Sequence, residues 1–216
     1  MQNSNRNLAE VRAVIFDYGE VLCHRPSPQE MAQLAGFFGI APEKFGVFWD
    51  RNRGPFDRGD LSADVYWTML AEDAGVKLTA EELKAVCELD MAMWSHVNGE
   101  MVEWARRLAS SGKKIGVLSN MHPDMVAHCR REFSWLSHFD HLTFSGEVRL
   151  IKPEPEIYEH ALRGLGVEAA EALFLDDRER NIEAARVLGI HAVHMRSPQQ
   201  LHEDLRAAGF PILPPG

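Results

Sequence analysis

The feature that most constrains the fold is a series of short apolar runs, the last four of which are separated by helical patterns. The five runs have the character of strands and lie at residues 11–17, 114–120, 141–146, 171–177 and 191–195. Strands that alternate with helices are typical of β-α-β units, in which neighbouring strands run parallel. We therefore expect an α/β fold built on one parallel sheet.

The stretch between the first and second runs differs, because helical periodicity continues through it without a strand. Four helical patterns occur at residues 27–39, 42–51, 62–75 and 79–94. Thr79 and Glu82 have the spacing of a capping box at the start of the last pattern. We therefore expect a core domain of residues 1–23 and 96–216, with a helical domain of residues 24–95 inserted after the first strand.

The composition narrows the class of partner. The chain has 216 residues, enough for one substantial core with or without a smaller domain, and a formal charge of -9. Binding of nucleic acid without sequence preference needs a basic face, so nucleic acid is not an expected partner. The first ten residues are polar, unlike a secretory signal, and no stretch approaches the roughly 20 apolar residues of a membrane span. We expect a cytoplasmic monomer or homodimer without a membrane partner.

Polar side chains stand where the expected strands end. They are Asp17, Ser119 with Asn120, Asp176 with Asp177, and Arg196 with Ser197, while Lys152 follows the third run. Ligands of open parallel sheets bind beyond the carboxyl ends of the strands, so most of these groups should converge. Three carboxylates, one lysine and a hydroxyl suit a hard divalent cation, an anionic substrate rich in oxygen, and a carboxylate nucleophile.

The order Asp17, Ser119, Lys152 and Asp176-Asp177 resembles the four motifs of the haloacid dehalogenase (HAD) superfamily over nearly the whole chain. The helical insert lies where that family carries its C1-type cap, between the first and second motifs. The resemblance implies a Rossmann-like parallel sheet of strand order 5-4-1-2-3. It also implies, most often, hydrolysis of a phosphate ester through an aspartyl-phosphate.

The resemblance further implies a role for each residue that matches a motif. Asp17 matches the nucleophile. The groups that bind phosphate in the family correspond here to the hydroxyl of Ser119, the backbone amide of Asn120 and the ammonium of Lys152. In the family this lysine also holds the nucleophile. The implied cofactor is Mg2+, and its ligands match Asp17, the backbone carbonyl of Gly19, and Asp177, with Asp176 and Asn181 beside them.

Gly19 departs from the family pattern. Most phosphatases of the family carry an aspartate two residues after the nucleophile, which protonates the leaving group and then activates water. Glycine supports neither step. A metal-free 2-haloacid dehalogenase also lacks that acid, but it would not need the repulsive pair Asp176-Asp177. A non-catalytic HAD-fold protein that binds a phosphorylated ligand would have no need of the nucleophile Asp17.

The interpretation that fits best is a magnesium-dependent phosphatase that tolerates the glycine and acts on a small phosphorylated metabolite. The transition state of phosphoryl transfer is loose, so catalysis depends more on positioning and charge than on proton transfer. The pattern FDxGxV at residues 16–21 resembles bacterial sugar-phosphate phosphatases of the α-glucose-1-phosphatase type and the amino-terminal phosphatase domain of soluble epoxide hydrolase. Candidates for the missing proton donor are Glu20 and His24, with water or a residue of the cap as alternatives.

The stretch 49–62 of the insert is dense in arginine and aromatic residues. Gly54, Pro55 and Gly59 predict tight turns there, in a loop between two helices. Caps close over the core, exclude water and supply contacts to the substrate. The candidate contacts in this stretch are Arg51, Arg53 and Arg58 for charge, and Asp57 or Asp60 for sugar hydroxyl groups.

Overall fold

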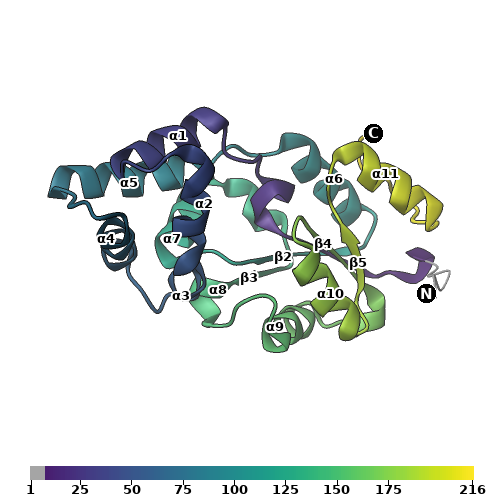
Figure 1. Ribbon diagram of the computed structural model, residues 1–216. Coiled ribbons are helices and arrows are strands. Elements are labelled where there is room, and N and C mark those ends of the chain that lie inside the picture. Colours follow the sequence, from purple (N-terminus) through teal and green to yellow (C-terminus); the bar gives the residue numbers. More distant parts are fainter. Residues whose placement is uncertain (1–7) are drawn as a thin grey trace.

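The protein has an α/β fold around one five-stranded parallel sheet (Figure 1). The computed structural model describes residues 8–216. The strands are β1 (Ala13–Phe16), β2 (Lys114–Ser119), β3 (His141–Phe144), β4 (Ala172–Asp176) and β5 (His191–His194). They pair in the order β3-β2-β1-β4-β5, and each neighbouring pair is parallel. This is the expected order read from the other edge, and it is confirmed.

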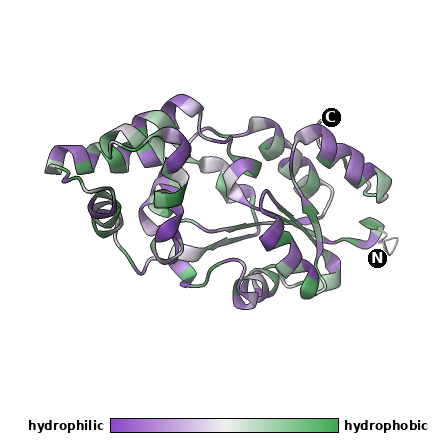
Figure 2. Ribbon diagram, in the orientation of Figure 1, coloured by the Kyte–Doolittle hydropathy of each residue, from purple (hydrophilic) through white to green (hydrophobic). Residues whose placement is uncertain are grey.

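Helices cover both faces of the sheet, which is therefore the middle of three layers (Figure 1). Over one face lie α6 (Gly99–Ser110), α7 (Pro123–Glu132) and α11 (Pro198–Ala207), and over the other lie α9 (Pro155–Leu165) and α10 (Glu179–Val187). Side chains of β1 alternate between the two cores, with Val14 and Phe16 in one and Ala13 and Ile15 in the other. Hydrophilic and hydrophobic residues alternate along these helices, because each has one face in a core (Figure 2).

Short 3-10 turns complete the core layers. They are η1 (Leu8–Glu10), η3 (Ser134–His138) and η4 (Ala169–Glu171). None of the helices described between residues 8 and 216 is long and apolar enough to span a membrane.

The residues between β1 and α6 form a separate group of helices beside the sheet, here called the insert (residues 24–95; Figure 1). Its helices are α1 (Pro28–Phe37), α2 (Pro42–Arg51), α3 (Arg53–Arg58), α4 (Ala63–Ala74) and α5 (Ala80–Met93). They bury a hydrophobic cluster of their own, which includes Phe38, Phe45 and Trp67. The capping box of Thr79 and Glu82 at the start of α5 is present as predicted.

The prediction of a loop at residues 49–62 is partly wrong, because the helix α3 occupies the middle of this stretch. Gly54 and Pro55 lie inside the first turn of this helix instead of in tight turns. The amides of a first helical turn have no acceptor within the helix, so a proline there loses no hydrogen bond. The turn predicted at Gly59 is present, since this glycine ends α3 with a φ of 83°.

The third strand is two residues shorter than expected, because Ser145 and Gly146 begin α8 (Ser145–Val148). The amide of Gly146 donates to the carbonyl of Met121, with 3.0 Å between nitrogen and oxygen. A Cβ atom on Gly146 would lie 2.7 Å from that carbonyl oxygen and 2.8 Å from the nitrogen of Pro123. Only glycine lets α8 approach the segment after β2 so closely.

We expect Gly146→Ala to lower the free energy of unfolding by about 1–3 kcal/mol, the usual cost of overpacking, because backbone atoms would have to move. Gly46→Ala is the matched control: Gly46 is exposed in α2, and a Cβ there meets nothing within 4 Å. Because alanine favours helix, the control should gain about 0.5–1 kcal/mol. Chemical denaturation measures both, and equal effects would contradict the close approach at Gly146.

Candidate active site

Asp17 lies at the point where β1, the central strand, ends. Its amide donates to the carbonyl of Leu175 on β4, which continues the sheet by one residue. The chain then enters the tight turn η2 (Tyr18–Leu22), and the amide of Tyr18 donates to Oδ1 of Asp17 over 2.7 Å. No donor among residues 8–216 contacts Oδ2 of Asp17, so this oxygen is available to a ligand.

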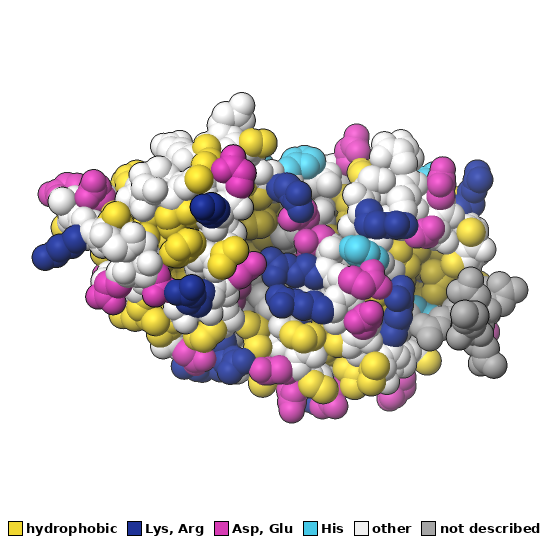
Figure 3. Space-filling view, in the orientation of Figure 1, with side chains coloured by type: hydrophobic (Ala, Val, Ile, Leu, Met, Phe, Trp, Pro, Cys, Tyr) yellow, Lys and Arg dark blue, Asp and Glu magenta, His cyan; other side chains and the backbone are white. Residues whose placement is uncertain are grey.

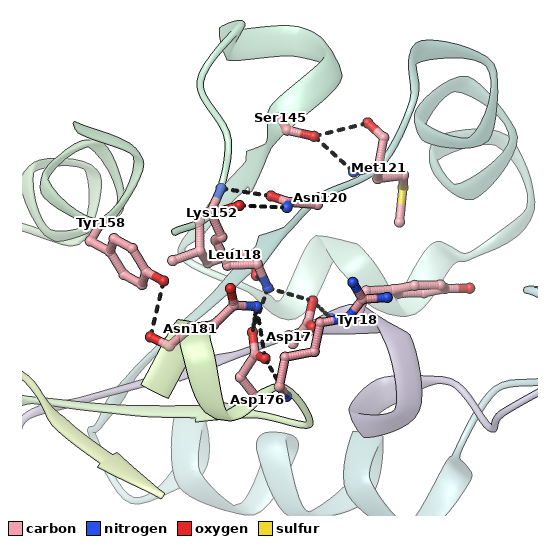
Figure 4. A network of polar contacts seen from close by, with 11 residues as sticks. Asp17, Tyr18, Leu118, Asn120, Met121, Ser145, Lys152, Tyr158, Asp176 and Asn181 are labelled. Carbon is pink, nitrogen blue, oxygen red and sulfur yellow. Dashed lines mark hydrogen bonds and ion pairs between the residues drawn. The ribbon is translucent and has the colours of Figure 1, made fainter. Parts of the chain in front are cut away.

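Lys152 is buried at the centre of the site, between two carboxylates (Figure 4). Its Nζ lies 2.9 Å from Oδ1 of Asp17 and 2.6 Å from Oδ2 of Asp176, and it donates to the carbonyl of Leu118 over 2.9 Å. Three acceptors thus match the three N–H groups of the ammonium. Burial alone would lower the pKa of Lys152, but the charges of Asp17 and Asp176 outweigh it and raise the pKa. The lysine therefore stays charged.

Asp176 and Asp177 have different surroundings although they are adjacent. Asp176 is fully buried, and its oxygens accept hydrogen bonds from Lys152, from Nδ2 of Asn181 and from the amide of Arg178. Asp177 is only partly buried and lies in the wall of the cavity described below. Asp176 therefore holds other residues in place, whereas the carboxylate of Asp177 can reach a ligand.

The end of β2 supplies a hydroxyl and a rigid loop. Ser119 is buried, and its hydroxyl has no hydrogen-bond partner among the described residues. The side chain of Asn120 accepts from the amide of Lys152 over 2.9 Å and donates to its carbonyl over 3.0 Å (Figure 4). This two-way contact fixes the segment of Lys152 against the end of β2 and leaves the hydroxyl of Ser119 free for a ligand.

The three acids form a site with excess negative charge. Carboxylate oxygens of Asp17, Asp176 and Asp177 lie within 4.8 Å of one another. Burial and the neighbouring acids raise the pKa of Asp17 to about 7 against the effect of Lys152, and burial with Asp176 and Glu20 raises the pKa of Asp177 to about 6. Such shifts mean that Asp17 and Asp177 ionise only at a cost, which a bound cation would remove.

The donor set fits a magnesium ion. The groups available are oxygens, which Mg2+ prefers. Oδ1 of Asn181 is buried without a hydrogen-bond partner, although its Nδ2 holds Asp176. An orphaned buried oxygen beside three clustered carboxylates is the arrangement expected where a hydrated cation belongs.

A cavity of about 410 Å³ opens over these residues, between the core and the insert. Acidic and basic side chains meet in this hollow, which Figure 3 shows near the centre of the molecule. Its wall on the core side includes Asp17, Ser119, Lys152 and Asp177. On the insert side it includes Trp49, Arg53, Asp57, Arg58 and Trp94.

The structure brings only part of the remaining predicted residues to this cavity. Arg53 and Arg58 lie in its wall, whereas Arg51 does not and is paired with Asp73 over 2.8 Å. Of the two proton-donor candidates, Glu20 lies in the wall and is paired with Arg25 over 2.8 Å. His24 is exposed and outside the wall.

The sequence analysis missed a buried charged cluster where insert and core meet. Arg53 Nε donates to Asp57 over 2.9 Å, and its Nη1 lies 3.7 Å from Asp90. Nε2 of His122, from the core, lies 3.3 Å from the other oxygen of Asp90. Arg53 and His122 meet Asp90 only through tertiary packing, so no sequence spacing indicates the cluster, although Arg53 and Asp57 are both candidate substrate contacts from the sequence.

The relatives that match this chain over nearly their whole length include two phosphatases. A sesquiterpene phosphatase, astK, from Aspergillus oryzae is 26% identical over 90% of this chain and 95% of its own. A D-ribitol-5-phosphate phosphatase from Bacteroides thetaiotaomicron is 24% identical over 90% of this chain and 97% of its own.

Solved structures share the fold. A HAD-family enzyme from Bacteroides thetaiotaomicron, crystallised as a mutant with magnesium and inorganic phosphate, has a TM-score of 0.67 at 20% identity, covering 85% of this chain and 93% of its own. An L-2-haloacid dehalogenase from Xanthobacter autotrophicus has a TM-score of 0.65 at 20% identity, covering 91% of this chain and 82% of its own. The haloacid dehalogenase-like hydrolase model matches residues 11–189. The chain therefore belongs to the haloacid dehalogenase-like hydrolase family.

Proposed function

We propose that this enzyme is a magnesium-dependent phosphatase that hydrolyses a small phosphate monoester through an aspartyl-phosphate on Asp17. The observation that carries the proposal is the position of Asp17 in the cavity wall, where Lys152 and the amide of Tyr18 fix its Oδ1 and no donor among residues 8–216 contacts its Oδ2. A carboxylate held by one oxygen can attack with the other. The acids beside it supply the site for a cation.

Asp17 and Asp177 would hold the magnesium ion with the carbonyl of Gly19, and Asn181 Oδ1 would bind it or a water on it. When bound, the ion neutralises the negative charge of the acids and of the phosphate. The ammonium of Lys152 and the hydroxyl of Ser119 would bind phosphate oxygens and stabilise the charge that develops on them. Asp176 would act through Lys152, by holding its ammonium in place.

The insert would serve as a cap that excludes water and contacts the leaving group. Arg53 and Arg58 are its cationic groups in the cavity wall, and Trp49 and Trp94 its large aromatic ones. The two full-length relatives are named for a phosphorylated polyol and for a sesquiterpene, which supports a phosphate monoester as substrate and leaves the leaving group open. Dehalogenation is less well supported, because three neighbouring carboxylates would repel one another without a cation.

We expect turnover of p-nitrophenyl phosphate that requires Mg2+ and that Asp17→Asn abolishes. Loss of the nucleophile leaves no covalent route, while the fold should remain, since the amide can still accept from Lys152 and Tyr18. Asp124→Asn is the matched control, because Asp124 is exposed on α7 and outside the cavity wall. Phosphate release measures the activity. Activity without metal, or halide release from 2-haloacids, would favour the dehalogenase instead.

We expect the affinity for Mg2+ to fall as the pH is lowered from 8 to 5. The pKa values of about 7 for Asp17 and about 6 for Asp177 mean that protons compete with the metal over this range. Both groups gain protons as the pH falls, so binding must displace more protons at pH 5 than at pH 8. Isothermal titration calorimetry measures the affinity and, in buffers of different ionisation enthalpy, the protons released. A constant affinity would contradict this assignment of the metal ligands.

A further inference from the structure

The turn after Asp17 has room for a proton donor at position 19 but does not supply one. Gly19 has φ -62° and ψ 131°, a conformation open to any residue. A Cβ atom there would lie 3.5 Å from Cζ3 of Trp94, which is an ordinary van der Waals contact. The backbone therefore does not demand glycine, and another group in the cavity wall can hold the role that position 19 lacks.

Asp57 is the buried acid that the insert brings to the cavity. It lies in the wall and is 7% exposed, and Arg53 Nε contacts only its Oδ1. No hydrogen bond to its Oδ2 is present among residues 8–216. One oxygen is thus held, and the other is free to carry a proton toward a ligand.

The backbone of Asp57 is fixed to the loop that binds the phosphate. The hydroxyl of Ser145 donates to the carbonyl of Asp57 over 2.6 Å and accepts from the amide of Met121 over 2.8 Å. Figure 4 shows this hydroxyl beside Met121, two residues after Ser119. A phosphate seated on Ser119 and Lys152 would point its leaving group from the core toward the insert, the side on which Asp57 lies.

The surroundings of Asp57 raise its pKa above that of an ordinary aspartate. Burial raises the pKa of Asp57; the charges of Arg53 and His122 oppose that rise and the charge of Asp90 adds to it, and the net direction is upward. Arg53 lies on α3, His122 at the start of α7 and Asp90 on α5. The ring of Tyr66 from α4 stacks on Phe56, the residue before Asp57. A general acid needs a pKa closer to the working pH than an ordinary aspartate has.

We propose that Asp57 is the proton donor to the leaving group, a role that rests on the phosphatase activity proposed above. As Oδ2 of Asp17 attacks phosphorus, the bond to the leaving oxygen breaks and that oxygen takes the proton of Asp57. The resulting carboxylate then removes a proton from the water that attacks phosphorus. The bond between phosphorus and Asp17 breaks, phosphate leaves, and Asp57 is again protonated.

The test is the dependence of rate on the leaving group in Asp57→Asn. The series is p-nitrophenyl, p-chlorophenyl, phenyl and p-methoxyphenyl phosphate, with kcat/KM measured at saturating Mg2+. The unchanged protein should show a shallow dependence on the pKa of the leaving phenol. The variant should lose about 10²-fold or more on the poorest leaving groups, the usual contribution of a general acid, and far less on p-nitrophenyl phosphate.

Two further variants separate this role from a structural one. Asp60→Asn weakens another contact of the insert with the core, the ion pair to Arg149 at 2.9 Å, and should change all substrates alike. Gly19→Asp in the Asp57→Asn background should restore the shallow dependence. Uniform loss across the series in Asp57→Asn, or a steep dependence already in the unchanged protein, would overturn the role. The measurement on the unchanged protein is valid even if Asp57→Asn does not fold. If the unchanged protein shows no turnover of any phosphate ester, the phosphatase proposal itself is overturned.

Discussion

The buried ammonium of Lys152 is the interaction on which the site depends. Asp17 and Asp176 are both in the sheet interior, at the ends of neighbouring strands β1 and β4, where two ionised carboxylates would repel at short range. Lys152 contacts both and a carbonyl of β2 as well, so one side chain links three adjacent strands. A buried ion pair is stable only when its hydrogen bonds are satisfied, and here all three donors are used. The proposed nucleophile Asp17 is thereby oriented before a substrate arrives.

The strand order explains why these groups meet at all. With β1 in the middle of a parallel sheet, the carboxyl ends of β2 and β4 lie on either side of Asp17. The groups proposed to hold the cation come from the ends of β1 and β4, and the groups proposed to bind phosphate are Ser119 of β2 and Lys152. Both sets meet at Asp17, so a bound cation could neutralise the phosphate that this carboxylate would attack.

The sequence was most informative where function depends on backbone topology. Asp17, Ser119, Lys152 and Asp177 could be placed together because each follows an apolar run, and a parallel sheet aligns the ends of its strands. Side chains of the insert could not be placed in this way. Arg51 and Arg53 are two residues apart, yet one is paired at the surface and the other lines the cavity. Arg51 ends α2 and Arg53 begins α3, so the break between these two helices gives the two side chains different surroundings. The sequence predicts a loop at this break because glycine and proline are ambiguous at a helix start.

The glycine at position 19 has a consequence for the insert. An acid on η2 would move with Asp17, since both lie on one short segment of the core. An acid on α3 depends instead on contacts between the two parts, such as those of Ser145 with Asp57 and of His122 with Asp90. Proton transfer by Asp57 would then require the insert to be seated on the core, the state that would also exclude water from the cavity. Under this proposal, hydrolysis of substrates with poor leaving groups would be coupled to closure of the insert, which an acid at position 19 would not demand.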